Sequence, residues 1–285
     1  MIMQLGDIQI DRILEMEVPF LSPYDAFPDA PHEEIKNNSQ WLQPWALCSL
    51  TGKLIITIQT WIIRTPKHLI LVDTCIGCNK TNHYFSEWHQ RTDDSWYMKL
   101  LSKGVNPEAV DYVFCTHLHG DHCGWNTRLV DGRWVPTFPN ARYIISRKEV
   151  DYVAAENTLA YQESALPIIE TGQIQAVESD FALNDSVWLE AMPGHTVGHT
   201  TVHLASGGQH AVLCGDLIHS PLQCRFPQWK YWIDFDPQQA IKTRQAFLES
   251  RAEDQLMVLT AHFPSPSAGI VEARGDAFNF RFTQS

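Results

Sequence analysis

The sequence predicts a mixed α/β fold in a single domain that spans residues 1–285. Segments with alternating or unbroken apolar residues indicate strands, and segments that open with a capping residue indicate helices between them. Neither an internal repeat nor a Gly/Ser linker divides the chain. A chain of 285 residues is within the range of one large α/β domain and can bury a sizeable core without disulfides.

Strand patterns recur from the N-terminus to residue 260, and the last two before the C-terminal helix form a hairpin about the turn at 206–209. Their apolar positions either alternate with polar ones or run unbroken, as in half-buried and fully buried strands. The expected strands are 7–14, 54–63, 68–73, 110–115, 141–145, 187–191, 200–205, 210–214 and 256–260.

Helices are expected between these strands. Ser146, with Glu149 three positions later, predicts a capping box at the start of one helix. Asp236 as the N-cap and Pro237 in the first turn predict the start of another. The expected helices are 95–103, 146–156 and 236–251.

Two segments lack a sustained pattern. Residues 19–50 are rich in Pro, Asp, Asn and Trp, and we expect an N-terminal excursion near the pocket rather than a separate domain. Residues 157–185 are weakly patterned.

The composition indicates which partners and which cellular compartment are expected for this protein. Lys and Arg number 21 against 33 Asp and Glu, and the resulting charge of −12 argues against nucleic acid as a partner. The most apolar run, 54–63, is too short to span a membrane, and residues 1–7 lack the basic start of a signal peptide. Seven cysteines without a repeating spacing suit free thiols. We therefore expect a cytoplasmic protein with a small-molecule substrate.

Three histidines and one aspartate lie within six positions directly after the buried strand 110–115. In an extended segment His117 and His119 point the same way, because they are two residues apart. Asp121 and His122 follow a glycine and project from the start of the next element. Such donors can serve two neighbouring points in space, and they suit zinc, with manganese, iron and cobalt left open.

Three further candidates also follow predicted strands. His195 follows the strand 187–191, Asp216 follows the strand 210–214, and His262 follows the strand 256–260. Strand ends that meet at one edge of a sheet bring distant residues to a single site.

The motif His-x-His-x-Asp-His at a strand end resembles the signature of the metallo-β-lactamase-fold hydrolases, and the resemblance covers about residues 50–265. It implies a four-layered αββα sandwich and a dinuclear zinc centre. In that centre, one Zn²⁺ would be held by His117, His119 and His195, and the second by Asp121, His122 and His262. Asp216 would bridge the two ions.

Differences between the branches of this superfamily indicate which branch the chain resembles. The flavodiiron-type oxygen reductases carry glutamate where this chain has His119, so histidine favours zinc and hydrolysis. The β-lactamases proper lack an aspartate in the place of Asp216. What remains resembles the lactonase, carboxylesterase and phosphotriesterase group. His219, where quorum-quenching lactonases usually carry tyrosine, looks closer to the methyl-parathion-hydrolase-like members.

The resemblance implies hydrolysis of small apolar esters or lactones, with phosphotriesters as a further class, by a hydroxide that bridges two zinc ions. Asp121 is expected to orient the nucleophile or shuttle its proton in addition to its ligand role. His219 either acts on the substrate, as a hydrogen-bond donor or a proton relay, or is a packed histidine that supports the site. The alternatives are a β-lactamase or nuclease of the same fold, a di-iron redox protein, and a metal-binding protein without turnover.

Other residues have weaker signals. His199 is expected to support the site rather than bind metal, and Asp73 could hydrogen-bond a ligand histidine. Cys75 and Cys78 have the spacing of half a zinc knuckle, but no second Cys-x-x-Cys completes it. The aromatic loop Phe226–Trp232 suits either an apolar gate over the substrate or a dimer contact, so a homodimer is left open.

Overall fold

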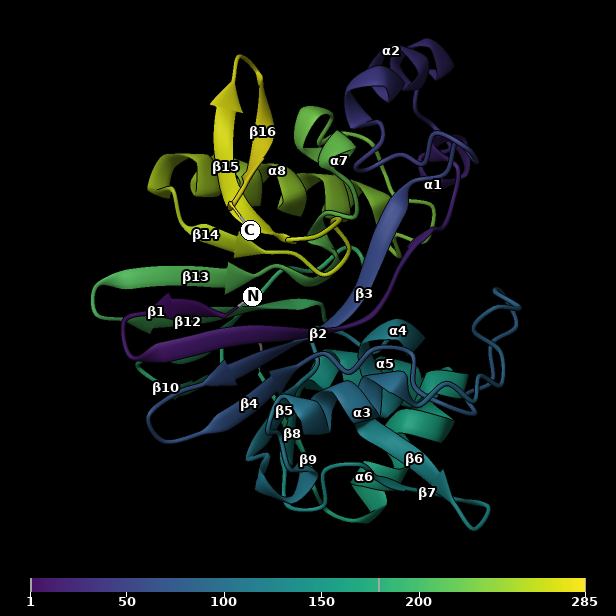
Figure 1. The fold of residues 1–285 in the computed structure, drawn as a ribbon, viewed down its shortest axis with the longest axis vertical. Coiled ribbons are helices and arrows are strands. Elements are labelled where there is room, and N and C mark those ends of the chain that lie inside the picture. Colours follow the sequence, from purple (N-terminus) through teal and green to yellow (C-terminus); the bar gives the residue numbers. More distant parts are fainter. Residues whose placement is uncertain (1, 179, 285) are drawn as a thin grey trace.

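Two seven-stranded sheets form the centre of the molecule, which a computed structural model describes over residues 2–178 and 180–284 (Figure 1). The first sheet is antiparallel from β1 to β4 and parallel from β4 to β9, in the order β1-β2-β3-β4-β5-β8-β9. Its strands are β1 (Met3–Leu5), β2 (Ile8–Pro19), β3 (Ile55–Arg64), β4 (Leu69–Val72), β5 (Tyr112–Phe114), β8 (Arg142–Ser146) and β9 (Ile174–Val177).

The second sheet runs in sequence order, and only its β13–β14 pair is parallel. Its strands are β10 (Ala182–Asn184), β11 (Val187–Ala191), β12 (Thr200–Ser206), β13 (Gln209–Leu213), β14 (Met257–Leu259), β15 (Ala268–Arg274) and β16 (Ala277–Phe282). A separate hairpin consists of β6 (Thr127–Val130) and β7 (Arg133–Pro136).

Helices cover the outer face of each sheet. In Figure 1, α3, α5 and α6 lie beside the first sheet, and α7 and α8 lie beside β14–β16 of the second. The helices are α1 (Pro23–Ala26), α2 (His32–Leu42), α3 (Ser95–Ser102), α4 (Gly120–Cys123), α5 (Arg147–Ala155), α6 (Leu166–Glu170), α7 (Pro221–Arg225) and α8 (Pro237–Asp254). Together with the two sheets they confirm the expected α/β sandwich of four layers.

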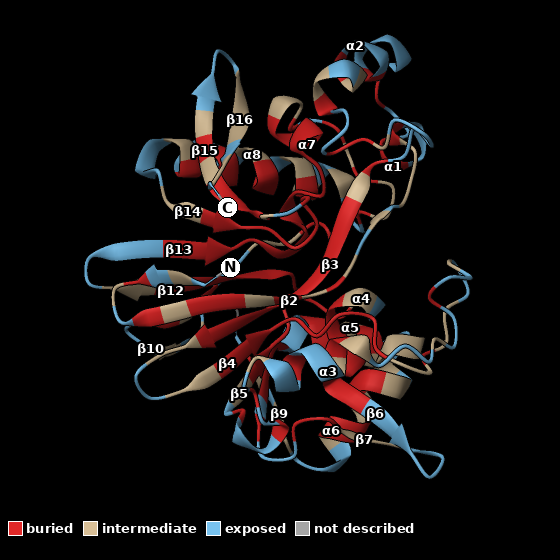
Figure 2. Ribbon diagram, viewed as in Figure 1, coloured by how far each residue is buried: buried red, intermediate tan, exposed pale blue. Residues whose placement is uncertain are grey.

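The inner core lies between the sheets and is apolar on both sides. Ile10 and Ile63 of the first sheet and Val202 and Leu213 of the second belong to one buried cluster. Figure 2 shows this burial along the central strands, while the outer ends of the hairpins are exposed. Burying both inner faces stabilises the sandwich, because apolar surface leaves water on each side.

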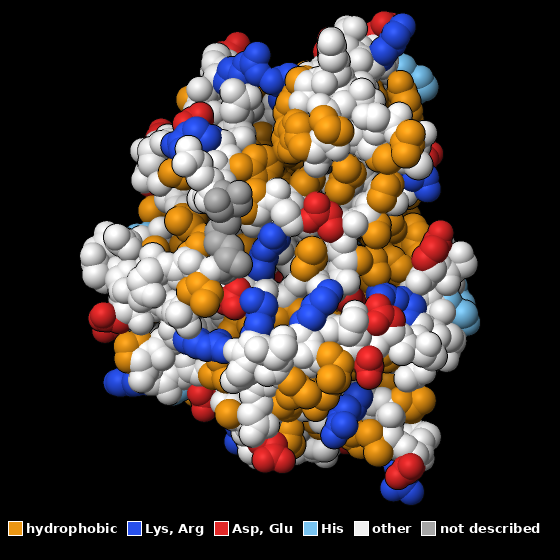
Figure 3. All heavy atoms as spheres, in the orientation of Figure 1, with side chains coloured by type: hydrophobic (Ala, Val, Ile, Leu, Met, Phe, Trp, Pro, Cys, Tyr) orange, Lys and Arg blue, Asp and Glu red, His pale blue; other side chains and the backbone are white. Residues whose placement is uncertain are grey.

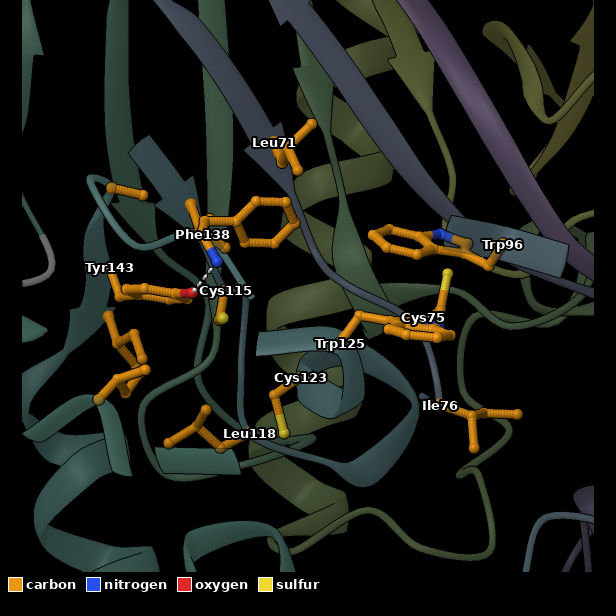
Figure 4. Packing of buried hydrophobic residues seen from close by; sticks show 14 of the residues in the cluster. Leu71, Cys75, Ile76, Trp96, Cys115, Leu118, Cys123, Trp125, Phe138 and Tyr143 are labelled. Carbon is orange, nitrogen blue, oxygen red and sulfur yellow. Dashed lines mark hydrogen bonds between the residues drawn. The ribbon is translucent and has the colours of Figure 1, made fainter. Parts of the chain in front are cut away.

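The outer core of the first sheet holds the segments that lead to the metal-binding loops. Trp96 of α3 stacks on Trp125 with ring centroids 5.0 Å apart, and its indole donates to Thr60. Figure 4 shows these rings in the same buried cluster as Tyr143, whose hydroxyl donates to the Asn126 carbonyl oxygen. The residues just after the His motif are therefore held by packing on one side of the sheet.

The structure confirms the expected strands and helices with small shifts at their ends, except that β2 runs five residues further, to Pro19, and it differs from the sequence analysis in three places. The segment 19–50 contains α1 and α2, which were not predicted. The side chain of Ser146 makes no capping hydrogen bond, so the expected capping box with Glu149 is wrong. The predictions also missed the β15–β16 hairpin. The single domain over 1–285 stays a prediction.

The surface and the helices bear on the expected partners. None of the described helices is long and apolar enough to cross a membrane. On the face shown in Figure 3, acidic and basic side chains are interspersed with hydrophobic ones. The absence of a nucleic-acid partner, the homodimer and the cytoplasmic location stay predictions.

Candidate metal centre

The loops that follow the strands bring the seven sequence-predicted donors together at one edge of the sandwich. His117 and His119 follow β5, and Asp121 and His122 lie in the short helix α4. The other three follow strands of the second sheet. These are His195 after β11, Asp216 after β13 and His262 after β14. Each sheet thus supplies part of one cluster.

The donor atoms form two groups, within each of which the atoms lie no more than 4.8 Å apart. One group consists of His117, His119, His195 and Asp216, and the other of Asp121, His122 and His262. Asp216 also reaches the second group, because its Oδ1 lies 3.2 Å from His122 Nε2 and 3.0 Å from His262 Nε2. Its Oδ2 lies 3.3 Å from His195 Nε2 in the first group.

The contacts inside the cluster fit bound cations better than they fit hydrogen bonds. His195 Nε2 lies 3.0 Å from His119 Nδ1, and His122 Nε2 lies 3.2 Å from His262 Nε2. Two imidazole nitrogens this close place either two lone pairs or two N–H groups together unless a single proton or a metal ion lies between them. His117 Nε2 is buried and has no hydrogen-bond partner. Buried polar atoms without partners are rare, and a cation would satisfy this one.

Charge inside the cluster is concentrated on Asp216. Burial opposes ionisation of this carboxyl, but the surrounding histidines, His122 and His262 foremost, outweigh it and hold its pKa well below the usual range. Burial lowers the pKa of His117 and His119, so these two imidazoles are neutral and able to donate a lone pair. Burial also lowers the pKa of His195, but hydrogen bonds to Asp216 and Asp234 outweigh it and raise that pKa to about 9.

Four of the histidines are oriented through their other ring nitrogen. His122 Nδ1 lies 2.9 Å from Asp73 Oδ2, as expected from the sequence. His195 Nδ1 lies 3.0 Å from Asp234 Oδ1, and His262 Nδ1 lies 2.8 Å from the Thr57 carbonyl oxygen. His117 Nδ1 lies 3.1 Å from the Thr116 hydroxyl. Such partners fix the tautomer and the aim of a metal-ligating imidazole.

Sequence reasoning missed Asp234. Its second carboxylate oxygen accepts from Arg244 of α8 at 3.2 Å and from the Tyr231 amide at 2.9 Å. The residue lies in an irregular loop, where no periodicity marks it. The only signal in the sequence was an aspartate just before a predicted helix. That signal was assigned to the nearby Asp236, which is the N-cap and accepts a hydrogen bond from the Gln239 amide.

Sequence reasoning also assigned Glu149 the wrong role. Its buried carboxylate accepts from the Leu118 amide at 3.1 Å, from the Thr196 hydroxyl at 2.8 Å and from the Gly198 amide at 3.0 Å. Leu118 lies between two candidate ligands, and Thr196 follows a third. Glu149 therefore ties together the two loops that present His117, His119 and His195.

His199 and His219 lie beside the two groups without belonging to either. His199 Nε2 accepts from the Asp216 amide at 3.0 Å, which agrees with the expected supporting role. His219 Nε2 lies 3.1 Å from Asp216 Oδ2, and its ring stacks on Tyr231 with centroids 3.6 Å apart. Because His219 also lines the pocket, both roles considered for it stay open.

A pocket of about 690 Å³, part of it open to solvent, opens above the cluster. We call it the aromatic pocket. His119, Asp121, Asp216, His219 and His262 line it together with Phe20, Ile56, Asn82, Tyr84, Phe85, Trp88, Gly120, Tyr231, Trp232 and Ile233. Apolar side chains next to a few convergent polar groups are typical of small-molecule sites.

The residues of the aromatic loop, for which a gate and a dimer contact were left open, lie in two different surroundings. Tyr231 and Trp232 line the aromatic pocket. Phe226 and Trp229 stack on each other with centroids 4.1 Å apart and pack in a cluster with Phe27 of the N-terminal segment. Among the described residues of 19–50, only Phe20 lines this pocket.

The cysteines lie outside both donor groups. Cys75 is buried beside Thr60, and the thiol of Cys78 donates to the Asp93 carbonyl oxygen at 2.9 Å. All seven cysteines are free, as expected. Burial raises the pKa of Cys75 well above its usual value and that of Cys78 to about 11, so both thiols are protonated at neutral pH.

The comparisons with known proteins agree with this fold and site. The family model of the metallo-beta-lactamase superfamily matches residues 57–262. Because this match covers more than half of the chain, the chain belongs to the metallo-beta-lactamase superfamily. With its lactonase relatives and its His/Asp cluster, it is a hydrolase of that superfamily.

The relatives include N-acyl homoserine lactonase AiiA of Bacillus thuringiensis subsp. kurstaki, which is 25% identical over 223 residues. That alignment covers 74% of this chain and 83% of the lactonase. Two solved structures share the fold with TM-scores of 0.84, and each comparison covers 100% of this chain and 97% of the other. They are the hydrolase AbOPH of the beta lactamase superfamily, at 23% identity, and AidC, a dizinc quorum-quenching lactonase, at 21%.

Proposed function

We propose that the chain is a dinuclear zinc hydrolase of lactones and small esters that carry an apolar substituent. His117, His119 and His195 would hold one ion, Asp121, His122 and His262 the other, and Asp216 would bridge them. The observation that carries this proposal is the position of Asp216, whose two oxygens reach both donor groups. Imidazole and carboxylate donors suit zinc, and manganese, iron and cobalt are outcomes of the test.

Two ions so held would supply a bridging water of lowered pKa as the nucleophile and Lewis-acid polarisation of the scissile carbonyl. The chain itself positions the reacting groups. Asp121, a member of the second donor group, also lines the pocket, where its carboxylate can orient the nucleophile or accept its proton. His219 lines the same pocket and can donate a hydrogen bond to the substrate or relay a proton.

The lining of the aromatic pocket supports an apolar group on the substrate. Phe20, Phe85, Trp88 and Trp232 are among the lining residues, and burial of an acyl chain or a ring against them supplies binding free energy. The relatives named N-acyl homoserine lactonases favour a lactone with an acylated amine. Aryl esters and phosphotriesters are secondary classes, because the same donor set can polarise a phosphoryl oxygen.

The test is elemental analysis of the purified protein, paired with hydrolysis assays on N-acyl homoserine lactones, an aryl ester and a phosphotriester. We expect about two zinc ions per chain and turnover of the lactones. A redox-active iron centre, or stoichiometric zinc without turnover of any of the three classes, would overturn the proposal. Cleavage of penicillins or of nucleic acid in preference to lactones would place the chain in another branch of the superfamily.

A further inference from the structure

A second pocket adjoins the aromatic pocket at the metal-binding loop. We call it the α5 pocket, because Tyr152 and Val153 of α5 form one of its walls, with Leu159 and Ala160 just beyond the helix. Its volume is about 1180 Å³, part of it open to solvent. Nothing in the proposed function uses this space.

The two pockets share the residues that stand between them. Asn82, Tyr84, His119, Gly120 and Ile233 line both. His119 is a candidate metal ligand, so the junction lies at the reacting centre rather than at a remote rim. A group bound over His119 can therefore extend into either pocket.

Gly120 leaves the junction open. A Cβ atom built on Gly120 would meet no heavy atom within 4 Å, so the space above this residue is free. A bulky side chain at this position would instead stand between the two pockets. At Gly120, which lines both pockets, no side chain separates them.

The chemistry of the α5 pocket suits an apolar ligand. Its lining contains neither Lys nor Arg. Its one carboxylate, Glu149, already accepts from three donors, one of which is the hydroxyl of Thr196. At the rim, the Thr81 hydroxyl donates to Glu163, and the side-chain oxygen of Asn82 accepts from two amides. These polar groups are already paired, and the lining also contains the apolar side chains of Leu118, Val153, Leu159, Ala160 and Ile233.

We infer that the α5 pocket is a second substrate arm, which takes an unbranched apolar chain on the side of the scissile carbonyl opposite to the aromatic pocket. The preferred substrates then carry apolar groups on both sides of the ester bond, with the aromatic pocket holding one and the α5 pocket the other. This inference rests on the proposed function for the position of the carbonyl. A lactone substituted only on one side would fill a single arm.

The test uses ketones, which resemble the esters but have no bond that the protein can hydrolyse. Binding of acetophenone and hexanophenone to the zinc-loaded protein is measured by calorimetry. The phenyl group is common to both, and hexanophenone adds four methylenes to the chain. Each fully buried methylene strengthens binding by about fourfold, so partial burial of four should give hexanophenone at least a ~10-fold advantage.

The decisive variant is Ala160→Trp, which fills the α5 pocket from its wall. Its matched control is Ala155→Trp, which adds the same side chain at an exposed position at the end of α5, outside both pockets. We expect Ala160→Trp to lose the advantage of hexanophenone while keeping the wild-type affinity for acetophenone. Ala155→Trp should keep both. If circular dichroism shows that Ala160→Trp is unfolded, Leu159→Trp replaces it.

Equal affinity of the wild-type protein for the two ketones would overturn the inference, and so would an unchanged preference in the Ala160→Trp variant. Neither result depends on turnover, so failure of the proposed function shows separately, in the lactone and ester assays. If the protein binds hexanophenone in the α5 pocket but hydrolyses no ester, the inference about the α5 pocket stands and the proposed function is wrong.

Discussion

At the scale of single residues, Asp216 is the group on which the proposed centre depends. Its carboxylate reaches both donor groups, and its backbone amide is held by His199. We expect Asp216→Ala to bind one metal equivalent or fewer and to lose at least ~10³-fold in kcat, because the bridge and its negative charge disappear. Far-UV circular dichroism should remain that of the wild type. Wild-type turnover in this variant would contradict a dinuclear mechanism.

Glu149 supports a second prediction at the same scale. Glu149→Gln places an amide NH₂ against donors that now face carboxylate oxygens, so at least one buried donor of the two metal-binding loops loses its acceptor. We expect the zinc affinity, measured by competition with a chelator, to fall about 10–100-fold.

Thr196→Val is the matched variant, because it removes only the hydroxyl that donates to Glu149. Its zinc affinity should fall less than that of Glu149→Gln. A zinc affinity unchanged in Glu149→Gln would show that the carboxylate only supports the fold.

The buried Lys80 leads to a prediction of how the free energy of unfolding depends on pH. Its ammonium is buried, donates to Thr127 Oγ1 at 2.6 Å and to the Glu163 carbonyl oxygen at 2.8 Å, and burial lowers its pKa to about 7. The unfolded chain holds this proton up to about pH 10.4, so between these values the unfolded state binds more protons. The free energy of unfolding therefore rises with pH above about 7, by at most about 1.4 kcal/mol per pH unit.

The measurement compares urea unfolding of the wild type and Lys80→Met at pH 6.5 and pH 8.5. The difference between the two proteins removes the titrations they share. We expect the wild type to gain stability relative to Lys80→Met as the pH rises. A difference that stays constant, or that moves the other way, would show that Lys80 keeps its ordinary pKa in the folded protein.

At the scale of elements, the turn into α4 fixes where the ligands point. A Cβ on Gly124 would lie 1.8 Å from the Ile76 carbonyl oxygen, whereas a Cβ on Gly120 meets nothing within 4 Å. Gly124→Ala should therefore reduce the free energy of unfolding by at least ~2 kcal/mol, since backbone must move. Gly120→Ala, only four residues away in the same loop, should change it by less than ~0.5 kcal/mol. Equal losses in thermal or urea unfolding would contradict this difference.

Elements with a strong local pattern could be predicted from the sequence, and elements that depend on distant partners could not. The strand 110–115 is a continuous apolar run, and its assignment as β5 placed the first four candidate ligands correctly. The hairpin β15–β16 was missed, because only the residues of β16 alternate and those of β15 do not. The capping box failed because Glu149 hydrogen-bonds to Leu118, Thr196 and Gly198, segments that the local sequence does not reveal.

The same limit applies to the site. The seven candidate ligands all follow strands, so sequence position alone predicted that they meet. The positions of Asp234 and of the loop residues that line the α5 pocket depend on loop conformations, which the periodicity of the sequence does not encode. Distances in the chain illustrate the difficulty, because His195 and the Asp234 that orients it lie 39 residues apart.

At the scale of the whole molecule, the centre joins the two sheets, so metal binding and stability should be linked. Buried histidines that face each other without an ion between them cost free energy. Removal of the metal with a chelator should lower the melting temperature by about 10 °C, and added zinc should restore it. Scanning calorimetry measures the shift. Equal melting temperatures with and without metal would show that the centre contributes nothing to the fold.

The separation of the ligands along the chain also has a consequence for biosynthesis. His122 and His262 are 140 residues apart in sequence, yet their Nε2 atoms lie 3.2 Å apart. At about 5–20 residues per second, a ribosome needs roughly 7–28 s to pass from one to the other, so the nascent chain displays the first histidines long before their partners exist. In the proposed centre, loading with both ions would then follow closure of the two sheets. The metal content of a fresh preparation would accordingly report how many of its molecules had folded.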